Sequence, residues 1–565
     1  MLINRKQFIK SIIAGSLYII QNNSYSQNPV AYPHLREWNK DEFEKYSKWV
    51  ENIYTTKSEG DWKQKSAKID RIFVDDEMNL LNNKDFIEEG NPQLPKETLS
   101  LMNSLNHCGS FPKLVFLYYS YRRGLPSIIT KINSNSGGDI RYSSGNHPIE
   151  LIRSRPFHGN FADFLIKGMS GKYGGYNFVS GNYRTSPFLE ETDSVPIEIN
   201  REFLKPGSMA YNCDGHCLLV GKIDDSGEIH FLDSHPDRSI TFNQTMSALY
   251  CVNSAFTTNK DRWYDGFRNM RLSKTISGST VYFSNLEMRE FGFSLDQYEK
   301  MIEIIEKRKD GGLEVKGRKV MDFREFVKAR LQRKKELPLE ILKKSASELA
   351  SMFRERELFV QEAWKDVIIN GPITFPNDLP NENIYQSSGR WEMWSSPSSD
   401  VDRKNKYDYL ASRLEKIVQE FPNSVEVDYS EFNSQIELAK EIIEKKNLYF
   451  SEEIVIYKKS NGEEVILTLN DIEKRLFDLS FNPNHPPELR WGAPEGSKER
   501  EGMKLIKVPL SDGRIIDALE SYELEKGLRY YQYRQNSSSS LNPDNNPKEP
   551  PFQLIEERIK KYIQE

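Results

Sequence analysis

The chain has 565 residues, of which 28% are charged and 12% aromatic, and its formal net charge is −5. This length exceeds what one hydrophobic core usually serves, so two or three domains are expected. The small net charge provides no overall positive field to attract nucleic acid, and the aromatic content argues against disorder. We therefore expect a soluble globular protein that does not bind nucleic acid.

The first 26 residues have the pattern of a secretory signal peptide. Basic residues precede an apolar run at 11–20, and Ser-Tyr-Ser at 24–26 fits a cleavage site. The apolar run is too short to span a bilayer, and no later run approaches that length. The alternative is an N-terminal helix packed on the following domain. We expect a secreted or periplasmic protein whose mature form has no transmembrane segment.

Residues 27–95 form a polar, Trp-containing extension with helical stretches such as 40–54. A second helix is predicted at 110–123, directly after Cys108. Ser110 suits its N-cap, and the interior LVFLYYSY is apolar almost all round, which predicts a buried helix. At this position the helix dipole would favour a reactive thiolate, whereas the alternative is an inert core cysteine.

The segment 133–155 is rich in Gly, Ser and Asn and is long for a connection within a domain. Such length favours a functional loop, and the alternative is a solvated surface loop. In the functional interpretation Arg141, His147 and Arg153 line a substrate cleft.

Two β-rich runs flank a turn signal at 224–227, which predicts a hairpin. An even-length loop would pair His216 with His235 and Leu218 with Asp233. Because side chains alternate between the faces of a sheet, all four would share one face. A three-residue loop would break this arrangement.

A reactive thiol needs a neighbouring base, and the base needs a polar group that fixes its tautomer. Cys108, His216 and Asp233 would supply these three parts. The register also allows His235 to orient His216, but a carboxylate additionally stabilises the imidazolium, which favours Asp233.

These motifs resemble the papain-like superfold, especially the NlpC-type and CHAP-type bacterial amidases. The matching pieces are His-Cys-Gly at 107–109 before the apolar helix, Pro-Gly-Ser at 206–208, Gly-His at 215–216, and Asp233. The resemblance covers about residues 95–245 and implies Cys108 as nucleophile, His216 as base and Asp233 as orienting group. His107 stands where these families usually have Asp, and the interval from Cys to His is long. Membership of a superfold does not identify the substrate.

Export would place four cysteines, Cys108, Cys213, Cys217 and Cys251, in an oxidising compartment. If one disulfide forms among the last three, Cys108 remains available as a nucleophile. The spacing of Cys213, His216 and Cys217 also suits a metal, but on a continuous strand the cysteines face away from the histidine. We expect neither a metal nor a cofactor.

From about residue 291 the pattern becomes mainly helical. Helices are predicted at 294–309, 322–335, 339–364, 405–421 and 429–446, and hairpins at 454–469 and 505–519. Two loops contain Trp391, Trp394 and Trp491, which would bind substrate, although loop tryptophans often pack on their own domain. Residues 536–551 form a flexible tract before a short helix at 552–564.

The sequence therefore predicts an α+β protein in which a papain-like domain at 27–290 combines a buried helix with an antiparallel sheet. A mainly helical region with small hairpins follows at 291–535, and then the tail at 536–565. The leading function is hydrolysis of an amide bond in a peptide or a peptidoglycan stem peptide, with Arg141 and the three loop tryptophans binding substrate. The alternatives are a transglutaminase-like acyl transferase with the same triad and an inactive secreted binding or scaffold protein. The sequence does not indicate an oligomeric state.

Overall fold

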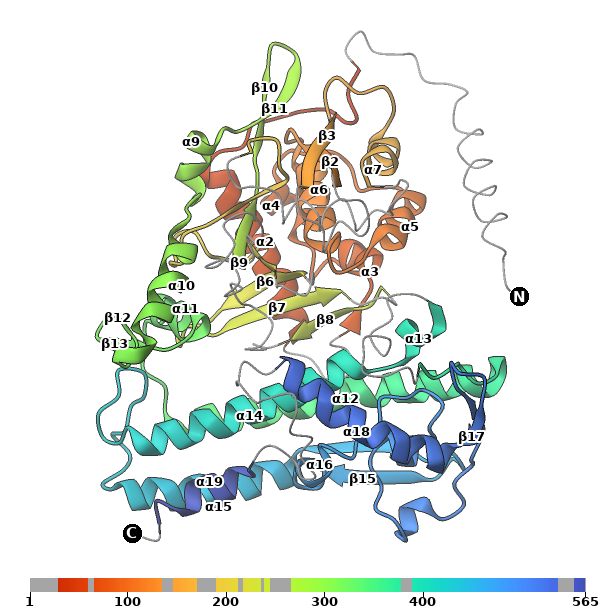
Figure 1. Ribbon diagram of the computed structural model, residues 1–565. Helices are drawn as coiled ribbons and strands as arrows, with labels where there is room; N and C mark the ends of the chain where they lie inside the picture. Colours follow the sequence, from red (N-terminus) through yellow and green to blue (C-terminus); the bar gives the residue numbers. More distant parts are fainter. Residues whose placement is uncertain are drawn as a thin grey trace.

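A seven-stranded antiparallel sheet organises the N-terminal part of the molecule (Figure 1). The computed structural model describes residues 29–58, 66–134, 146–169, 189–211, 217–234, 238–243, 266–376, 389–536 and 553–563. The strand order is β1 (Ser66–Ala67), β8 (Ile240–Asn243), β7 (Ile229–Ser234), β6 (Cys217–Ile223), β5 (Met209–Tyr211), β9 (Gly266–Met270) and β4 (Ser194–Pro196). With 48% helix and 18% strand, the structure confirms the mixed α+β class.

Helix α6 (Phe111–Arg123) is buried along its whole length, as its apolar sequence predicts. Its first turns pack Phe111 and Val115 against Leu219 and Leu232 of the sheet, around a small apolar void. Gly124 ends the helix in the left-handed region at φ 65°, a conformation that glycine adopts without strain. The helix is thus fixed against one face of the sheet, here named the inner face.

Further helices and a hairpin surround α6 (Figure 1). They are α2 (Lys40–Ser58), α3 (Ile69–Val74), α4 (Lys84–Ile87), α5 (Lys96–Leu105), α7 (Phe161–Met169) and the pair β2 (Ile128–Ser134) and β3 (Asn146–Arg153). The described part of the predicted loop at 133–155 belongs largely to this hairpin, and its residues 135–145 lie outside the described part of the chain. Aromatic stacking joins the layers: the ring of Trp38 stacks on Phe116 of α6 with 5.0 Å between centroids.

The outer face of the sheet is covered by two helices that follow the predicted domain boundary at residue 290. These are α10 (Asp296–Lys307) and α11 (Phe323–Leu331), whose apolar side chains form one core with Leu218, Val220 and Phe231. The α+β unit thus extends to about residue 331, because a boundary at 290 would separate this helical layer from the sheet that it covers.

Ser294 and Gln297 have the spacing of a capping box at the start of the predicted helix 294–309, but the box does not form. Helix α10 begins two residues later, and the Gln297 side chain is buried against the sheet. It accepts a hydrogen bond from Phe267 N at 2.9 Å and donates to the carbonyls of Phe267 and Ile197. The glutamine therefore hydrogen-bonds to the backbone of β9, instead of capping its own helix.

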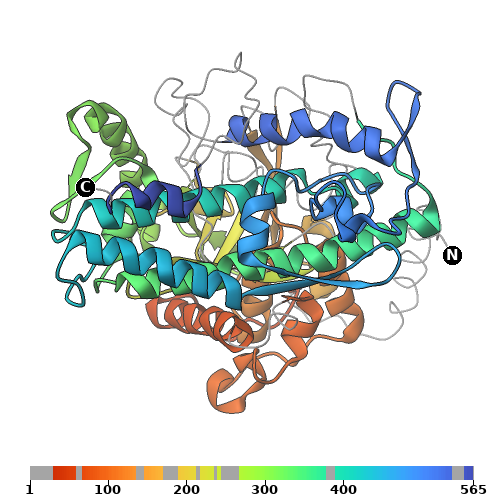
Figure 2. The same cartoon turned by 90° about the horizontal axis from the view of Figure 1, so that it is seen from below.

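The later part of the chain is mainly helical, as predicted (Figures 1 and 2). It contains α12 (Pro338–Asn370), α13 (Gly389–Trp394), α14 (Pro397–Gln419), α15 (Gln435–Glu452), α16 (Leu469–Arg475), α17 (Pro487–Arg490), α18 (Ala518–Asn536) and α19 (Ile555–Lys560). Both predicted hairpins are present, as β14 (Ile454–Lys458) with β15 (Glu464–Thr468) and β16 (Lys507–Pro509) with β17 (Ile515–Asp517). The short terminal helix α19 buries Ile555 and Ile559 in the core of this region.

Ion pairs join the two parts of the molecule. Glu228, in the β6–β7 turn, accepts from Lys328 Nζ of α11 at 2.8 Å and from Arg413 Nη1 of α14 at 3.0 Å. Lys328 Nζ also bonds Glu336 at 3.0 Å. These side chains are largely buried, so each charge depends on its partners.

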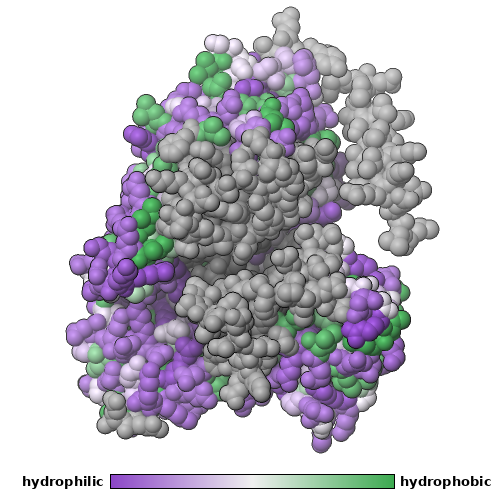
Figure 3. All heavy atoms as spheres, viewed as in Figure 1, coloured by the Kyte–Doolittle hydropathy of each residue, from purple (hydrophilic) through white to green (hydrophobic). Residues whose placement is uncertain are grey.

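The surface seen in Figure 3 is mainly hydrophilic over its described part, with scattered hydrophobic side chains. Within the described ranges, no helix is long and apolar enough to cross a membrane.

Candidate active site at the start of helix α6

The β6–β7 hairpin carries the residues on which the predicted triad depends. Leu219 lies opposite Leu232 and Val220 opposite Phe231, which is the predicted register. Extending this register toward the strand ends places Cys217 opposite Ser234. The predicted pairing is therefore confirmed over the part of the strands distant from the turn.

Near the turn the register is shifted by one residue, so that Lys222 lies opposite His230. The predicted even-length loop is wrong, and a β-bulge between Val220 and Lys222 compensates for the error. The bulge contains Gly221, where an added Cβ would lie 2.5 Å from the ring of Tyr54. Close packing of α2 on β6 thus requires glycine here, and this contact is not visible in the local turn sequence.

Alternation along the strands assigns side chains to the two faces of the sheet. Cys217 packs in the core of the inner face with α6, whereas Leu218 and Phe231 pack in the outer core with α10 and α11. Asp233 is 6% exposed and follows Phe231 by two residues, which places it on the outer face. Ser234 is paired with Ile240, an inner-face residue, and lies on the α6 side.

Cys108 is a free thiol, half-buried in the turn that leads into α6. The amide of Phe111 donates to the His107 carbonyl at 2.8 Å. Ser110 Oγ accepts from the His107 amide at 2.9 Å and donates to the Leu105 carbonyl at 2.6 Å. Ser110 therefore fixes the turn that holds the cysteine, instead of capping the third helical amide as expected.

The start of α6 lies beside the connection between β7 and β8. Asn106 Nδ2 is 3.5 Å from the Arg238 carbonyl, directly before β8. Burial, and secondarily the charge of Arg238, lower the pKa of His107. Asn106 Oδ1 and Ser234 Oγ are buried and have no hydrogen-bond partner among the residues that the structure describes. Polar atoms available to a ligand therefore occur at the same end of the sheet as Cys108.

Several predicted site residues lie outside the described part of the chain: His216, His235, Arg141, Cys213 and Cys251. The sequence links both histidines to the described site, since His216 directly precedes Cys217 and His235 directly follows Ser234. Among the residues that the structure describes, no group of three or more His, Cys, Asp or Glu side chains could hold a metal ion.

The predicted aromatic contact surface consists largely of core residues. Trp491 is 0% exposed and stacks on Tyr457, with 5.7 Å between ring centroids. Trp391 is 3% exposed and stacks on Phe375 at 5.6 Å. Only Trp394 is partly exposed. Trp391 and Trp491 therefore stabilise the C-terminal core, and their packed rings are not available to a substrate.

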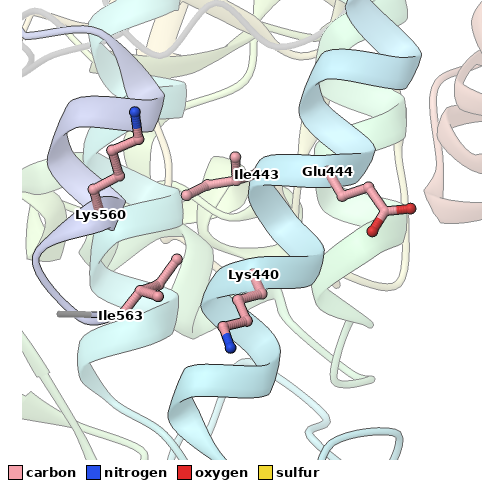
Figure 4. A pocket seen from close by; sticks show the side chains of 5 residues that line it. All are labelled: Lys440, Ile443, Glu444, Lys560 and Ile563. Atoms are coloured by element: carbon pink, nitrogen blue, oxygen red, sulfur yellow. The ribbon is translucent and has the colours of Figure 1, made fainter. Parts of the chain in front are cut away.

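A surface pocket of about 370 Å³ lies between α15 and α19 (Figure 4). Its lining consists of Lys440, Ile443, Glu444, Lys560 and Ile563. This lining contains no thiol, hydroxyl or imidazole, and the pocket belongs to the helical region distant from α6 (Figure 1).

The sequence interpretation missed a buried polar network around His485. Nε2 of His485 lies 3.0 Å from Ser521 Oγ, while Nδ1 lies 2.6 Å from Ser480 Oγ and 3.3 Å from Glu525 Oε2. This chain of contacts from serine to histidine to glutamate is similar to that of a hydrolase triad. All of these residues are fully buried, however, so a substrate has no access to them. The rigid run Asn-Pro-Asn-His-Pro-Pro at 482–487 was the available signal.

Acid is expected to destabilise the C-terminal half through His485. Burial lowers its pKa from 6.5 to about 3, so below pH 6.5 the unfolded chain binds a proton that the folded chain does not. The free energy of unfolding should then fall with decreasing pH between about 6.5 and 3, by up to about 1.4 kcal/mol per pH unit. Urea titrations from pH 7 to pH 4 measure this slope.

The variant His485→Gln should show a shallower pH dependence, whatever its stability at pH 7. The exposed His158 offers a matched control, and His158→Asn should retain the wild-type curve. Equal slopes in wild type and His485→Gln would contradict the assignment.

Comparison of the chain with protein families, with curated proteins and with solved structures found no match.

Proposed function

We propose that this protein is a thiol-dependent amide hydrolase with Cys108 as the nucleophile and His216 as the general base. The position of Cys108 carries the proposal: a free, half-buried thiol at the start of a buried helix. The adjoining end of the sheet is where β6 begins and β7 ends, next to His216 and His235 in the sequence.

The proposed reaction has two steps. The Cys108 sulfur attacks the amide carbonyl carbon, and His216 transfers the thiol proton to the departing amine. Water, deprotonated by the same histidine, then hydrolyses the thioester and restores the thiol. The backbone N–H of Cys108, at the N-terminal end of α6, would stabilise the oxyanion that forms in each step.

Two side chains on β7 are candidates for orienting His216. The sequence resemblance favours Asp233, because a carboxylate stabilises an imidazolium. Asp233 lies on the outer face, the face that the sequence register also assigns to His216, whereas Ser234 lies on the α6 side with an Oγ that has no partner among the described residues. Mutation of each residue separates the two assignments, as argued in the Discussion.

The proposed substrate is a peptide or a peptidoglycan stem peptide, in keeping with the predicted export signal and the amidase-like motifs. Transglutaminase-like acyl transfer uses the same thioester and differs only in the acceptor. Adding a primary amine distinguishes the two, since a transferase forms a new amide where a hydrolase releases the free acid.

Thiol labelling tests the proposal without knowledge of the substrate. At pH 6, native Cys108 is expected to react with iodoacetamide at least about tenfold faster than in the urea-unfolded chain, where an ordinary thiol with a pKa near 8.5 has little thiolate. Mass spectrometry of the labelled peptides measures both rates, and the buried Cys217 thiol serves as an internal control for unfolding. Slower labelling in the native state, or a disulfide at Cys108, would rule out the nucleophile.

A further inference from the structure

The core of the C-terminal half contains a concentration of buried positive charge. The side chains lie on α12, α14, α18 and the segment 480–491, and each is at most 7% exposed: Arg356, Arg403, Lys404, Arg490 and Arg529. We name this group the cationic cluster. Two equally buried carboxylates, Asp400 and Glu525, lie within it.

Asp400 is the central acceptor of the cluster. It accepts two hydrogen bonds from Arg356, at 2.8 and 3.1 Å, and one from Arg403 Nη1 at 3.0 Å. Ser396 Oγ donates to Asp400 at 2.8 Å and accepts from Arg490 Nη2 at 2.8 Å. One carboxylate thus connects three guanidinium groups.

Glu525 is already used by other donors. Its carboxylate accepts from Arg529 Nε at 2.8 Å, from Ser480 Oγ at 2.8 Å and from the Phe481 amide at 2.9 Å. The neighbouring His485 adds no positive charge at neutral pH, because burial lowers its pKa to about 3. Among the described residues, five cationic side chains therefore surround two carboxylates, and a third carboxylate, Glu488, is buried in the segment 480–491 and bonded to Ser460, so positive charge exceeds negative charge in this core.

Several donors of the cluster have no hydrogen-bond partner. They are Arg356 Nη1, Lys404 Nζ, and Nε and Nη1 of Arg490. The indole N–H of Trp394 is also unpartnered; its ring packs 6.1 Å from that of Phe359, which lies 5.9 Å from the Arg490 guanidinium. Buried donors normally have a partner, and a buried charge without one is strongly unfavourable.

The pKa values of two side chains in the cluster are lowered, in agreement with their burial and their unpartnered donors. Burial, opposed by the charge of Asp400, lowers the pKa of Lys404 to about 8. Burial and the charge of Arg356 lower that of Arg490 to about 9. Both shifts are due mainly to burial of the charged group, and a bound anion would oppose them.

We propose that the cationic cluster binds one small tetrahedral oxyanion, phosphate or sulfate, through Arg356, Lys404 and Arg490. Guanidinium groups present paired donors that match the oxygens of such an ion, and a dianion offsets most of the excess charge. Because the side chains are more than nine-tenths buried, the ligand is a free inorganic ion instead of a group on a larger molecule. The ion would stabilise the C-terminal half and is independent of the chemistry at Cys108.

The test is thermal unfolding of the full chain after dialysis into chloride, with phosphate or sulfate added at constant ionic strength. At about a hundredfold excess over Kd, the melting temperature of the wild type should rise by about 5 °C. Phenyl phosphate, added in parallel, should give no comparable rise, since an ester is too large for the buried site.

The variant Lys404→Met replaces one unpaired cation with an uncharged side chain of similar shape. It should melt at a higher temperature than the wild type in chloride and respond less to phosphate. Lys446→Met is the matched control, because Lys446 is equally buried but bonded to Asn470 and Glu473. This control should lower the melting temperature and retain the full phosphate response.

Ion chromatography of the protein unfolded in chloride provides a second measurement. Release of about one equivalent of phosphate or sulfate from the wild type, and less from Lys404→Met, supports the site even if a tightly held ion makes added phosphate ineffective. No release combined with no thermal shift would overturn the proposal. An equal phosphate response in Lys404→Met and Lys446→Met would overturn it as well, because the ion would then bind elsewhere.

Discussion

The variant Cys108→Ser is expected to hydrolyse an amide substrate at least about a thousandfold more slowly than the wild type, measured as kcat/KM. The half-buried Cys108 thiol is the only thiol that the described structure places in the turn before α6, and unpartnered polar atoms lie nearby. A hydroxyl is far less acidic than a thiol, so the same base cannot activate it to the same extent. Release of free amine from a library of short peptides and stem peptides provides the assay.

A matched control is Ser104→Ala, on the helix α5 that precedes the turn. Ser104 Oγ donates only to the Leu101 carbonyl, at 2.7 Å and within the same helix, and the variant should retain wild-type activity. Full activity in Cys108→Ser would contradict the nucleophile assignment, and a loss matched by a lower melting temperature would indicate a folding defect instead.

The same assay separates the two candidates for the orienting group. The residue that orients His216 should lower kcat/KM by at least about tenfold when its hydrogen bond to the base is lost, and the other residue by less. A larger loss in Asp233→Asn assigns the role to the carboxylate that the sequence resemblance favours, and a larger loss in Ser234→Ala assigns it to the hydroxyl on the α6 side.

The elements that the sequence predicts well are those determined by nearby residues. The helix expected at 110–123 occurs at Phe111–Arg123, since its apolar interior and its terminal glycine act locally. The hairpin register is correct only because two deviations cancel: the turn differs by one residue, and the bulge at Gly221 restores the pairing. That bulge depends on Tyr54, far away in the sequence, so local turn rules could not predict it.

Features that depend on distant contacts were missed or misplaced. Gln297 bonds to the backbone of β9 instead of capping α10, and Trp491 packs in a core instead of presenting its ring to solvent. The cationic cluster combines side chains between Arg356 and Arg529, and no spacing rule connects such positions. Sequence patterns indicate what each segment prefers, whereas these contacts arise from the arrangement of whole layers.

The second large expected effect is the loss of folding when helices α10 and α11, which cover the outer face of the sheet, are removed. A chain of residues 29–290, which ends at the domain boundary that the sequence predicted, should fail to fold. It would lose nine buried apolar side chains from the outer core, of which seven lie on α10 and α11 and are larger than alanine: Tyr298, Met301, Ile304, Phe323, Phe326, Val327 and Leu331. At roughly 1.5–3 kcal/mol each, their burial contributes on the order of 10–20 kcal/mol as an upper estimate. This equals or exceeds the net stability of a typical domain, roughly 5–15 kcal/mol.

A chain of residues 29–336 provides the matched comparison, because it retains both helices. It also keeps Glu228 and Glu336 paired with Lys328, so the loss of Arg413 leaves no buried carboxylate without a cation. We expect this chain to show cooperative thermal unfolding by circular dichroism and to retain fast labelling at Cys108, whereas the chain ending at 290 shows neither. Cooperative unfolding of the shorter chain would instead mean that the sheet is stable with its outer face uncovered, and the α+β unit would then end at the boundary that the sequence predicted.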